Sequence, residues 1–225
     1  MFNKKIVTAI MVFLIIGMII SASAQDEKAK SQKQKSMTTE QVKKLSVGEW
    51  VSIAPEVRPS ISKNADGSMK PFYLTRTFTY SADGKFILQM INSADAYGKV
   101  PLVKIVLKGH TVWQGEHPVA AGAQKIDYIA DGAYEITPLI QGFADAMNHA
   151  ASNGFNKWEV NVTQNILGKA FPPFGLSEGQ IYGEFDLIYI KNDMMFWGAK
   201  HVDGRSFDKV ENRPDNLQIP MIRKQ

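Results

Sequence analysis

Apolar and polar residues alternate with period two along most of the chain beyond Val47, a pattern that predicts strands with one buried and one solvated face. From 72 to 80 the apolar side chains share one face while Thr75, Thr77 and Thr79 take the other, and Asp83-Gly84 predicts a hairpin turn. The same alternation marks segments 86–90, 103–107, 126–128, 134–136, 157–163, 181–189 and 194–199, with a strand end at Gly109 and a hairpin at 191–193. We therefore expect a mainly β chain of roughly eight to ten strands.

A regular antiparallel series either closes on itself or pairs as a sandwich, because open edges promote aggregation. Aromatic residues gathered on one face favour a single antiparallel β-barrel of lipocalin-like type, wide enough for side chains and one small ligand. Segment 139–152 follows Pro138 and has apolar residues at helical spacing, which predicts one inserted helix. Thr38 and Gln41 have the spacing of a capping box and predict a short helix before the barrel.

The N-terminal residues have the order of a secretory signal peptide: Lys4 and Lys5, an apolar run from 6 to 20, then Ala22-Ser23-Ala24. The run is shorter than the roughly 20 residues of a membrane-spanning helix, so we expect cleavage after Ala24, with an uncleaved anchor as the alternative. Residues 25–44 are expected to form a disordered basic tether and the short helix, and 45–225 the barrel domain. The protein is thus expected to be secreted or periplasmic, meeting the membrane only through its signal peptide.

The cysteine content and the distribution of charge limit the kinds of protein that this chain can be. The chain has no cysteine, which in an exported protein favours a bacterial periplasm or secretome. The net charge of +4 lies near the N-terminus, because Lys4 and Lys5 belong to the signal and residues 25–44 carry six Lys against three acidic residues. The remainder is close to neutral, so we expect no nucleic-acid partner.

No motif in the sequence has the context that would predict catalysis. The histidines, none of which has a second at metal-binding spacing, are His110, His117, His149 and His201. Gly175-Leu176-Ser177-Glu178-Gly179 has the Gly-x-Ser-x-Gly form, but it does not join a predicted strand to a predicted helix, so it does not predict a nucleophile turn. No phosphate-binding glycine loop occurs. Carboxylates paired across neighbouring strands stay open, since sequence spacing does not reveal them. We expect no catalytic residues, no metal and no cofactor.

Arg76 is the most informative polar residue, because it shares a face with the apolar residues of its strand. Its guanidinium is expected to point inward, where it needs a carboxylate or an aromatic ring. It either anchors the polar head of a ligand or closes one end of the barrel with Glu56 or Trp50, and the structural role is favoured. Inward-facing residues either line a cavity or fill it. The candidate ligand-binding residues are Trp50, Arg76, Phe78, Phe86, Leu88, Met90, Trp158, Phe185 and Tyr189.

One group of motifs resembles a known family. Gly48-Glu49-Trp50-Val51-Ser52, then Glu56-Val57-Arg58-Pro59 and Leu74-Thr75-Arg76, is similar to the repeated domain of the adenomatosis polyposis coli down-regulated family of secreted Wnt inhibitors. The likeness continues at Lys99-Val100-Pro101, Gly122, Arg213-Pro214 and Gln218-Ile219-Pro220-Met221. It implies a β-barrel with a hydrophobic pocket for a lipid chain, and Gly48, Glu56, Arg58 and Pro59 as structural motif residues. The two cysteines of animal members are absent: Pro55 or its neighbour Ala54 stands in the place of the first, and Gly98 in that of the second.

These observations predict an exported β-barrel that binds a hydrophobic small molecule, a lipid or an acyl chain, rather than an enzyme. The alternative is an extracytoplasmic interaction or scaffold module with a filled core, whose loops bind a protein partner. A third hypothesis is a hydrolase of unknown type that uses acids around Glu56 together with His117. Whether the interior is hollow or filled separates the first two.

Overall fold

The computed structural model describes residues 36–151, 153–201, 203 and 205–225, and Met37–Gln225 form one compact unit. The predicted signal peptide and the tether up to residue 35 lie outside the described residues. Among the described helices, none is long and apolar enough to cross a membrane.

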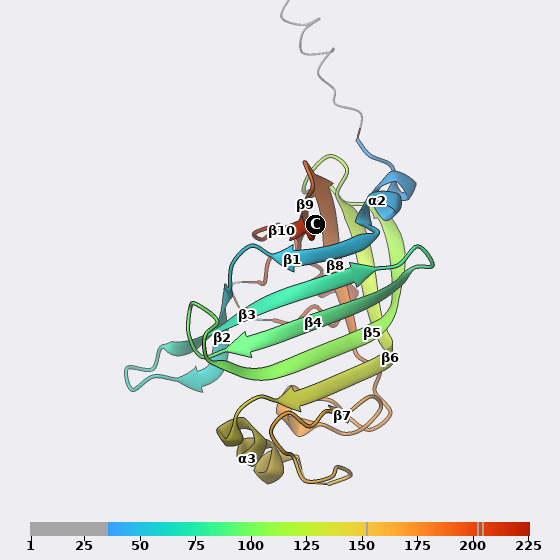
Figure 1. Ribbon diagram of the computed structural model, residues 1–225. Coiled ribbons are helices and arrows are strands. Elements are labelled where there is room, and N and C mark those ends of the chain that lie inside the picture. The colour runs from blue at the N-terminus through green and yellow to red at the C-terminus, as the bar shows by residue number, and fades with distance from the viewer. Residues whose placement is uncertain (1–35, 152, 202, 204) are drawn as a thin grey trace, which may run out of the picture. The chain divides into compact units, whose positions relative to one another are not determined.

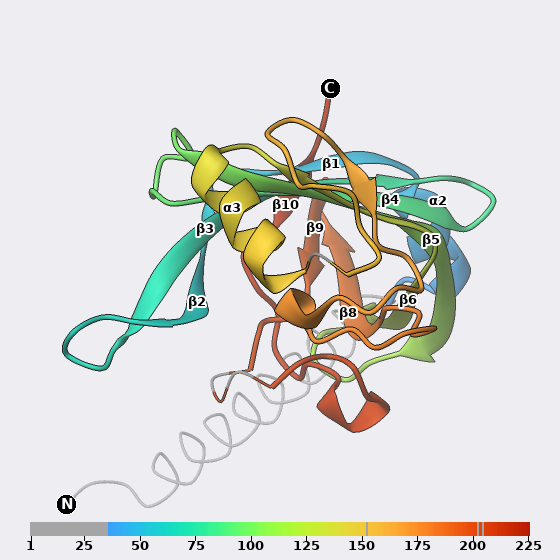
Figure 2. The same ribbon diagram turned by 90° about the horizontal axis from the view of Figure 1, so that it is seen from below.

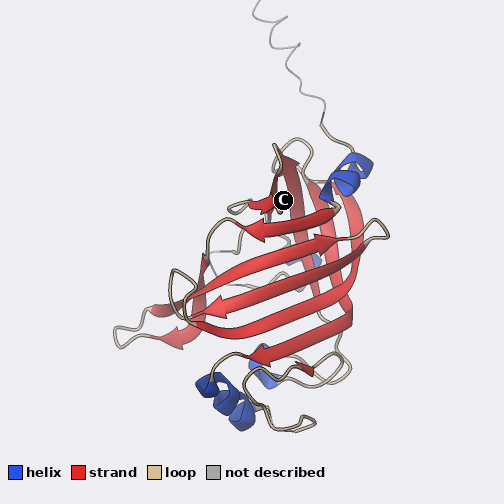
Figure 3. Ribbon diagram, in the orientation of Figure 1, coloured by secondary structure: helices blue, strands red, loops and turns tan. Residues whose placement is uncertain are grey.

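Within the described residues, ten antiparallel strands form one sheet that closes into a ring (Figure 1, Figure 3). The ring runs β1-β10-β9-β8-β6-β5-β4-β3 and closes because β1 pairs with β3 as well as with β10. Outside the ring, β2 extends along β3 and β7 along β6. The mainly β, self-closing fold is thereby confirmed. The strands are β1 (Gly48–Ser52), β2 (Glu56–Lys63), β3 (Met69–Tyr80), β4 (Lys85–Ser93), β5 (Pro101–Glu116), β6 (Gln124–Pro138), β7 (Gln164–Asn165), β8 (Gly183–Lys191), β9 (Met194–Trp197) and β10 (Met221–Arg223).

Both predicted hairpins are present and have the expected turn chemistry. Gly84, between β3 and β4, has a φ of 81°, a left-handed conformation that glycine adopts without strain. Between β8 and β9, Asn192 and Asp193 have φ values of 51° and 55°, and these two residue types tolerate that region best after glycine. Left-handed residues in such turns suit the twist of the flanking strands, so each turn helps to fix the register of its strand pair.

The two predicted helices are confirmed, and the inserted one is shorter than the predicted segment 139–152. α2 (Thr39–Ser46) begins with a capping box, in which Thr38 Oγ1 accepts from the Gln41 N–H and Gln41 Oε1 accepts from the Thr38 N–H. It buries Val42 completely, and the Ser46 carbonyl accepts from Trp50 Nε1 at 2.7 Å. α3 (Gln141–Ala150) lies in the long connection between β6 and β8. Short 3₁₀ turns follow at η1 (Pro172–Phe174) and η2 (Val210–Asn212).

The strand predicted at 157–163 is wrong, because that segment consists of turns and irregular backbone. Its alternation reflects the burial of Trp158 rather than a pleated surface. Trp158 is buried with Phe155 and Phe171, and its Nε1 donates to the Ala151 carbonyl at 2.9 Å, whereas Val162 is exposed. A single large aromatic residue can therefore produce a strand-like pattern without any strand pairing.

The strand end predicted at Gly109 is also wrong, since β5 continues to Glu116. The register against β6 shifts between Lys108 and His110, which marks a β-bulge. A Cβ at Gly109 would lie 1.8 Å from the Ile129 carbonyl oxygen. Glycine is here because the two backbones approach closely, not because the strand stops.

The ring is built from strands of very unequal length. β1, β9 and β10 have 5, 4 and 3 residues, whereas β3, β5 and β6 have 12, 16 and 15. β8 pairs with β6 only from Gln124 to Ile129, and further along β6 the partner is the short β7. The long strands therefore continue beyond the closed ring, where residues 139–182 pack against β6 (Figure 2). Figure 2 also shows the β2–β3 hairpin projecting from the other strands.

The close approach at Gly109 yields a stability prediction. Gly109→Ala should lower the free energy of unfolding by roughly 3 kcal/mol, because the added methyl group forces β5 and β6 apart. Gly142→Ala is the matched control, since a Cβ there meets nothing within 4 Å and lies in α3, where alanine is favoured by up to about 1 kcal/mol. Urea denaturation of both variants checks this, and equal stability of the two would contradict it.

Candidate functional site

A cavity of about 660 Å³ lies inside the sheet, a volume within the range of small-molecule sites. Most of its wall is apolar and comes from the inward faces of consecutive strands, which explains why the alternating pattern produces it. The apolar and aromatic lining residues are Phe72, Leu74, Phe78, Phe86, Leu88, Met90, Leu107, Tyr128, Ala130, Tyr182, Trp197 and Phe207. The polar lining residues are Arg58, Lys63, Arg76, Glu184, Asp186, Lys200, Asp203 and Gln218.

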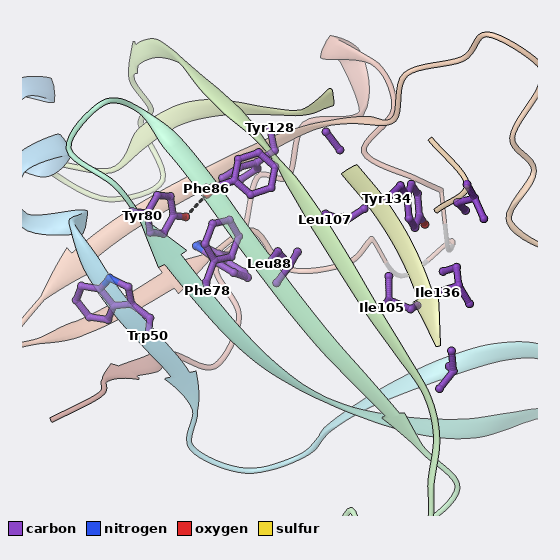
Figure 4. Close-up of a cluster of buried hydrophobic side chains, with 14 of the residues drawn as sticks. Trp50, Phe78, Tyr80, Phe86, Leu88, Ile105, Leu107, Tyr128, Tyr134 and Ile136 are labelled. Atoms are coloured by element: carbon purple, nitrogen blue, oxygen red, sulfur yellow. Dashed lines mark hydrogen bonds between the residues drawn. The ribbon is translucent and has the colours of Figure 1, made fainter. Parts of the chain in front are cut away.

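The end of the ring nearest α2 is filled by aromatic side chains (Figure 4). Phe78 stacks on Tyr80 with ring centroids 4.3 Å apart and touches Phe86 at 5.4 Å. The hydroxyls of Tyr80 and Tyr128 share a hydrogen bond, and burial raises the pKa of both groups well above its ordinary value. Both phenols are therefore neutral, and this end of the interior is closed to solvent.

Trp50 belongs to this closed end and not to the cavity wall. It is fully buried, and it lies opposite Phe78 in the β1–β3 pair. The guanidinium of Arg223 covers its ring at 4.2 Å from the centroid. Arg223 also donates to the carbonyls of Leu45 and Val47, so it ties the last strand to the first.

Arg76 points inward, as its position in the alternation predicts, and it is buried with 8% of its surface exposed. Its Nε and Nη2 donate to Glu56 Oε1 at 2.8 and 2.6 Å. Its guanidinium lies 4.2 Å from the centre of the Trp197 ring. The expected pairing with Glu56 is found, whereas the aromatic partner is Trp197 and not Trp50.

Glu56 binds two arginines at once. Its Oε2 accepts from Arg58 Nη2 at 2.7 Å while Oε1 accepts from Arg76. Arg58 Nη2 also donates to the side-chain oxygen of Gln218. Two guanidinium groups therefore share one carboxylate at this corner of the cavity.

The facing wall carries acids on β8. Asp186 is 5% exposed, and its Oδ1 accepts the N–H groups of Leu187 and Gly198 at 2.7 and 2.9 Å. Gly198 is required here, because a Cβ would lie 2.4 Å from that oxygen. Glu184 accepts from the Tyr182 hydroxyl. Burial first, and the charge of Glu184 second, raise the pKa of Asp186 to about 7.

The predicted ligand-binding residues divide into two groups. Arg76, Phe78, Phe86, Leu88 and Met90, all on β3 and β4, line the cavity together. The residues outside its lining are Trp50, Trp158, Phe185 and Tyr189. Their alternation or burial is real, but other parts of the chain cover them.

On β8 the inward face is opposite to the one expected. Glu184 and Asp186 line the cavity, while Phe185 lies 5.6 Å from the Arg213 guanidinium and Tyr189 packs on Phe196 at 5.8 Å. The C-terminal segment contacts this outer face through Arg213, and it also pairs with the edge of β8, where the Phe185 N–H donates to the Phe207 carbonyl at 2.7 Å. The alternating pattern could have identified Leu74 and Leu107 as cavity-lining residues, because each shares a face with other apolar residues of its strand. No local sequence signal identifies Lys200 or Phe207.

The other residues singled out by sequence have structural surroundings. Gly48 has a φ of 124°, and a Cβ there would lie 2.7 Å from Arg223 Nη1. Pro59 pairs in register with Pro71 at the edge of β3. His117 Nδ1 accepts from the Val119 N–H, and it does not line the cavity.

Among the described side chains, no group of three or more His, Asp or Glu residues could hold a metal ion. A comparison with known proteins finds no family model and no curated protein that matches this chain.

The Glu56 cluster yields a stability prediction. Glu56→Gln should lower the free energy of unfolding by about 3–5 kcal/mol, because it leaves the buried Arg76 without a counter-charge. Glu135→Gln is the control: its partner Lys108 is 44% exposed, so the loss should stay below about 1 kcal/mol. Chemical denaturation of both variants measures the two losses of stability. Losses of similar size would contradict a buried ion pair between Glu56 and Arg76.

Asp186 yields a pH prediction. Because its pKa is about 7 in the folded chain and near 3.8 when unfolded, the folded state holds a proton that the unfolded state has lost between these values. The free energy of unfolding should therefore fall as pH rises from about 4 to about 7. Asp186→Asn keeps the Oδ1 acceptor and should add about 2–4 kcal/mol at pH 8 but little at pH 4. Asp131→Asn, at an exposed position, is the control; the idea fails if both variants retain the wild-type pH dependence.

Proposed function

We propose that this chain is an exported binding protein for a hydrophobic ligand, a lipid or an acyl chain. The observation that carries the proposal is the cavity of about 660 Å³, whose wall is mainly apolar and aromatic. An interior meant only for stability is close-packed, because an empty apolar space forfeits contacts and destabilises the fold. A hollow of this size therefore favours a carrier over a scaffold with a filled core.

The composition of the cavity wall suits a flexible apolar ligand. Met90 and Leu88 offer adaptable and branched aliphatic surface, while Phe72 and Phe86 offer flat surface. Each methylene moved from water to such a wall is worth about 0.8 kcal/mol. A single alkyl chain can therefore gain substantial affinity without any specific hydrogen bond.

We further propose that the likeness to the Wnt-inhibitor domain family reflects a shared barrel with a lipid pocket. The motifs that carry the likeness contain Glu56, Arg58 and Arg76, and these residues form one ion-pair cluster beside the cavity. Export is supported by the signal-like order of residues 1–24. Chain segments that meet only in the folded protein thus carry the most specific part of the resemblance.

Native mass spectrometry of the purified protein tests the carrier proposal. We expect a co-purifying lipid, or a one-to-one complex with an added long-chain fatty acyl compound. The affinity should rise about fourfold with each added methylene until the chain exceeds the cavity. Absence of any bound lipid at every chain length tested would contradict the proposal.

A cavity-blocking variant supplies the matched prediction. Met90→Trp should lower acyl-chain affinity at least tenfold, because Met90 lines the cavity and the larger ring occupies the space of the ligand. Ile87→Trp is the control on the same strand, since Ile87 is 44% exposed on the outer face. Fluorescence titration measures both affinities, and circular dichroism checks that both variants fold. If the two variants bind the acyl chain with equal affinity, the ligand does not bind in this cavity.

A further inference from the structure

The cavity is amphipathic, and the position of its cations defines the kind of ligand it fits. This inference rests on the proposed function, because it concerns the chemistry of the ligand in the same cavity. Arg58, Lys63, Arg76 and Lys200 all line it, from β2, β3 and the segment after β9. Only Glu56 is paired with any of them among the described side chains.

The two lysines have no carboxylate partner. Neither Lys63 nor Lys200 forms an ion pair with a described acidic residue, and Lys200 lies over the ring of Phe207 at 5.2 Å. Arg58 has 23% of its side chain exposed, so its remaining N–H donors are accessible from the cavity side. An incoming anion would therefore meet free donors without breaking an existing ion pair.

Burial disfavours the charged forms of two of these cations. Burial lowers the pKa of the Arg58 guanidinium and outweighs the opposing effect of Glu56. Burial also lowers the pKa of Lys200; Glu184 raises it, and the nearby charge of Arg58 lowers it again. The charged forms of Arg58 and Lys200 are therefore less stable here than in water, and a bound anion would stabilise them.

The acids that line the cavity already have donors. Glu184 accepts from Tyr182, Asp186 accepts two backbone N–H groups, and Asp203 pairs with Arg205 at 3.3 Å. A cationic head group would have to compete with these donors. The hydrogen-bonding groups of the cavity that are still free for a ligand therefore belong to the cations.

We infer that the ligand is an anionic amphiphile, a single acyl chain with a carboxylate head, whose head binds between Arg58 and Lys200 while the chain lies along Leu88, Met90 and Leu107. Arg76, held by Glu56 and Trp197, lines the same cavity. A planar carboxylate accepts two N–H bonds from one guanidinium, which gives the head group a defined orientation.

The test compares palmitate with methyl palmitate and hexadecyltrimethylammonium, each below its critical micelle concentration, on the full mature chain. Palmitate should bind at least tenfold more tightly than its neutral ester, and the preference should shrink as salt is added. Arg58→Gln and Lys200→Gln should each remove most of that preference and leave the affinity for the ester unchanged. Lys191→Gln, at an exposed position at the end of β8, is the control and should retain the preference.

The outcomes separate the inference from the function on which it rests. Equal binding of acid and ester overturns the anionic head but leaves the carrier proposal standing. Tighter binding of the ammonium compound also overturns it and points to Glu184 and Asp186. Binding of none of the three probes overturns both. Should Arg58→Gln fail to fold, Lys200→Gln still decides the question, because Lys200 is exposed and holds no ion pair.

Discussion

Closure of the ring by β1 is the constraint from which the rest of the structure follows. This short strand uses one edge to pair with β3 and the other to pair with β10, so the backbone groups of both ends of the sheet are satisfied. Trp50, at its centre, is buried beneath Arg223, whose guanidinium also binds the carbonyls just before β1. Aromatic side chains fill this end of the ring, and the inward faces of the longer strands line the cavity beyond it.

The same geometry explains the buried charges. Once β3 is fixed in the ring, its parity aims Arg76 inward, where an unpaired guanidinium would be very costly. β2 continues along the edge of β3 beyond the end of β1 and brings Glu56 opposite Leu74, within reach of Arg76. Arg58, two residues further on, binds the same carboxylate. The element that neutralises the core arginine thus also places a second cation beside the cavity.

Apolar and charged parts of the cavity come largely from different elements. The strands β3 to β6 supply most of the apolar wall through their inward faces, while β2, β8 and the segment after β9 supply the charged residues other than Arg76. Aliphatic and aromatic surface stabilises a ligand in proportion to buried area, whereas fixed charges select the head group and its orientation. A cavity of this composition suits a molecule that is itself divided into an apolar chain and a polar end.

Local sequence determined much of the fold: the strands β3 and β4, both hairpins, the capping box of α2, and the inward position of Arg76. Periodicity and turn chemistry act within a few residues, so they can be seen in the chain alone. Tertiary structure decided what covers each face. Phe185 alternates correctly, yet the C-terminal segment covers it, and Asp186 faces the cavity instead. Alternation separates two faces of a strand without saying which is inside, and only packing between distant segments fixes that choice and leaves the interior hollow.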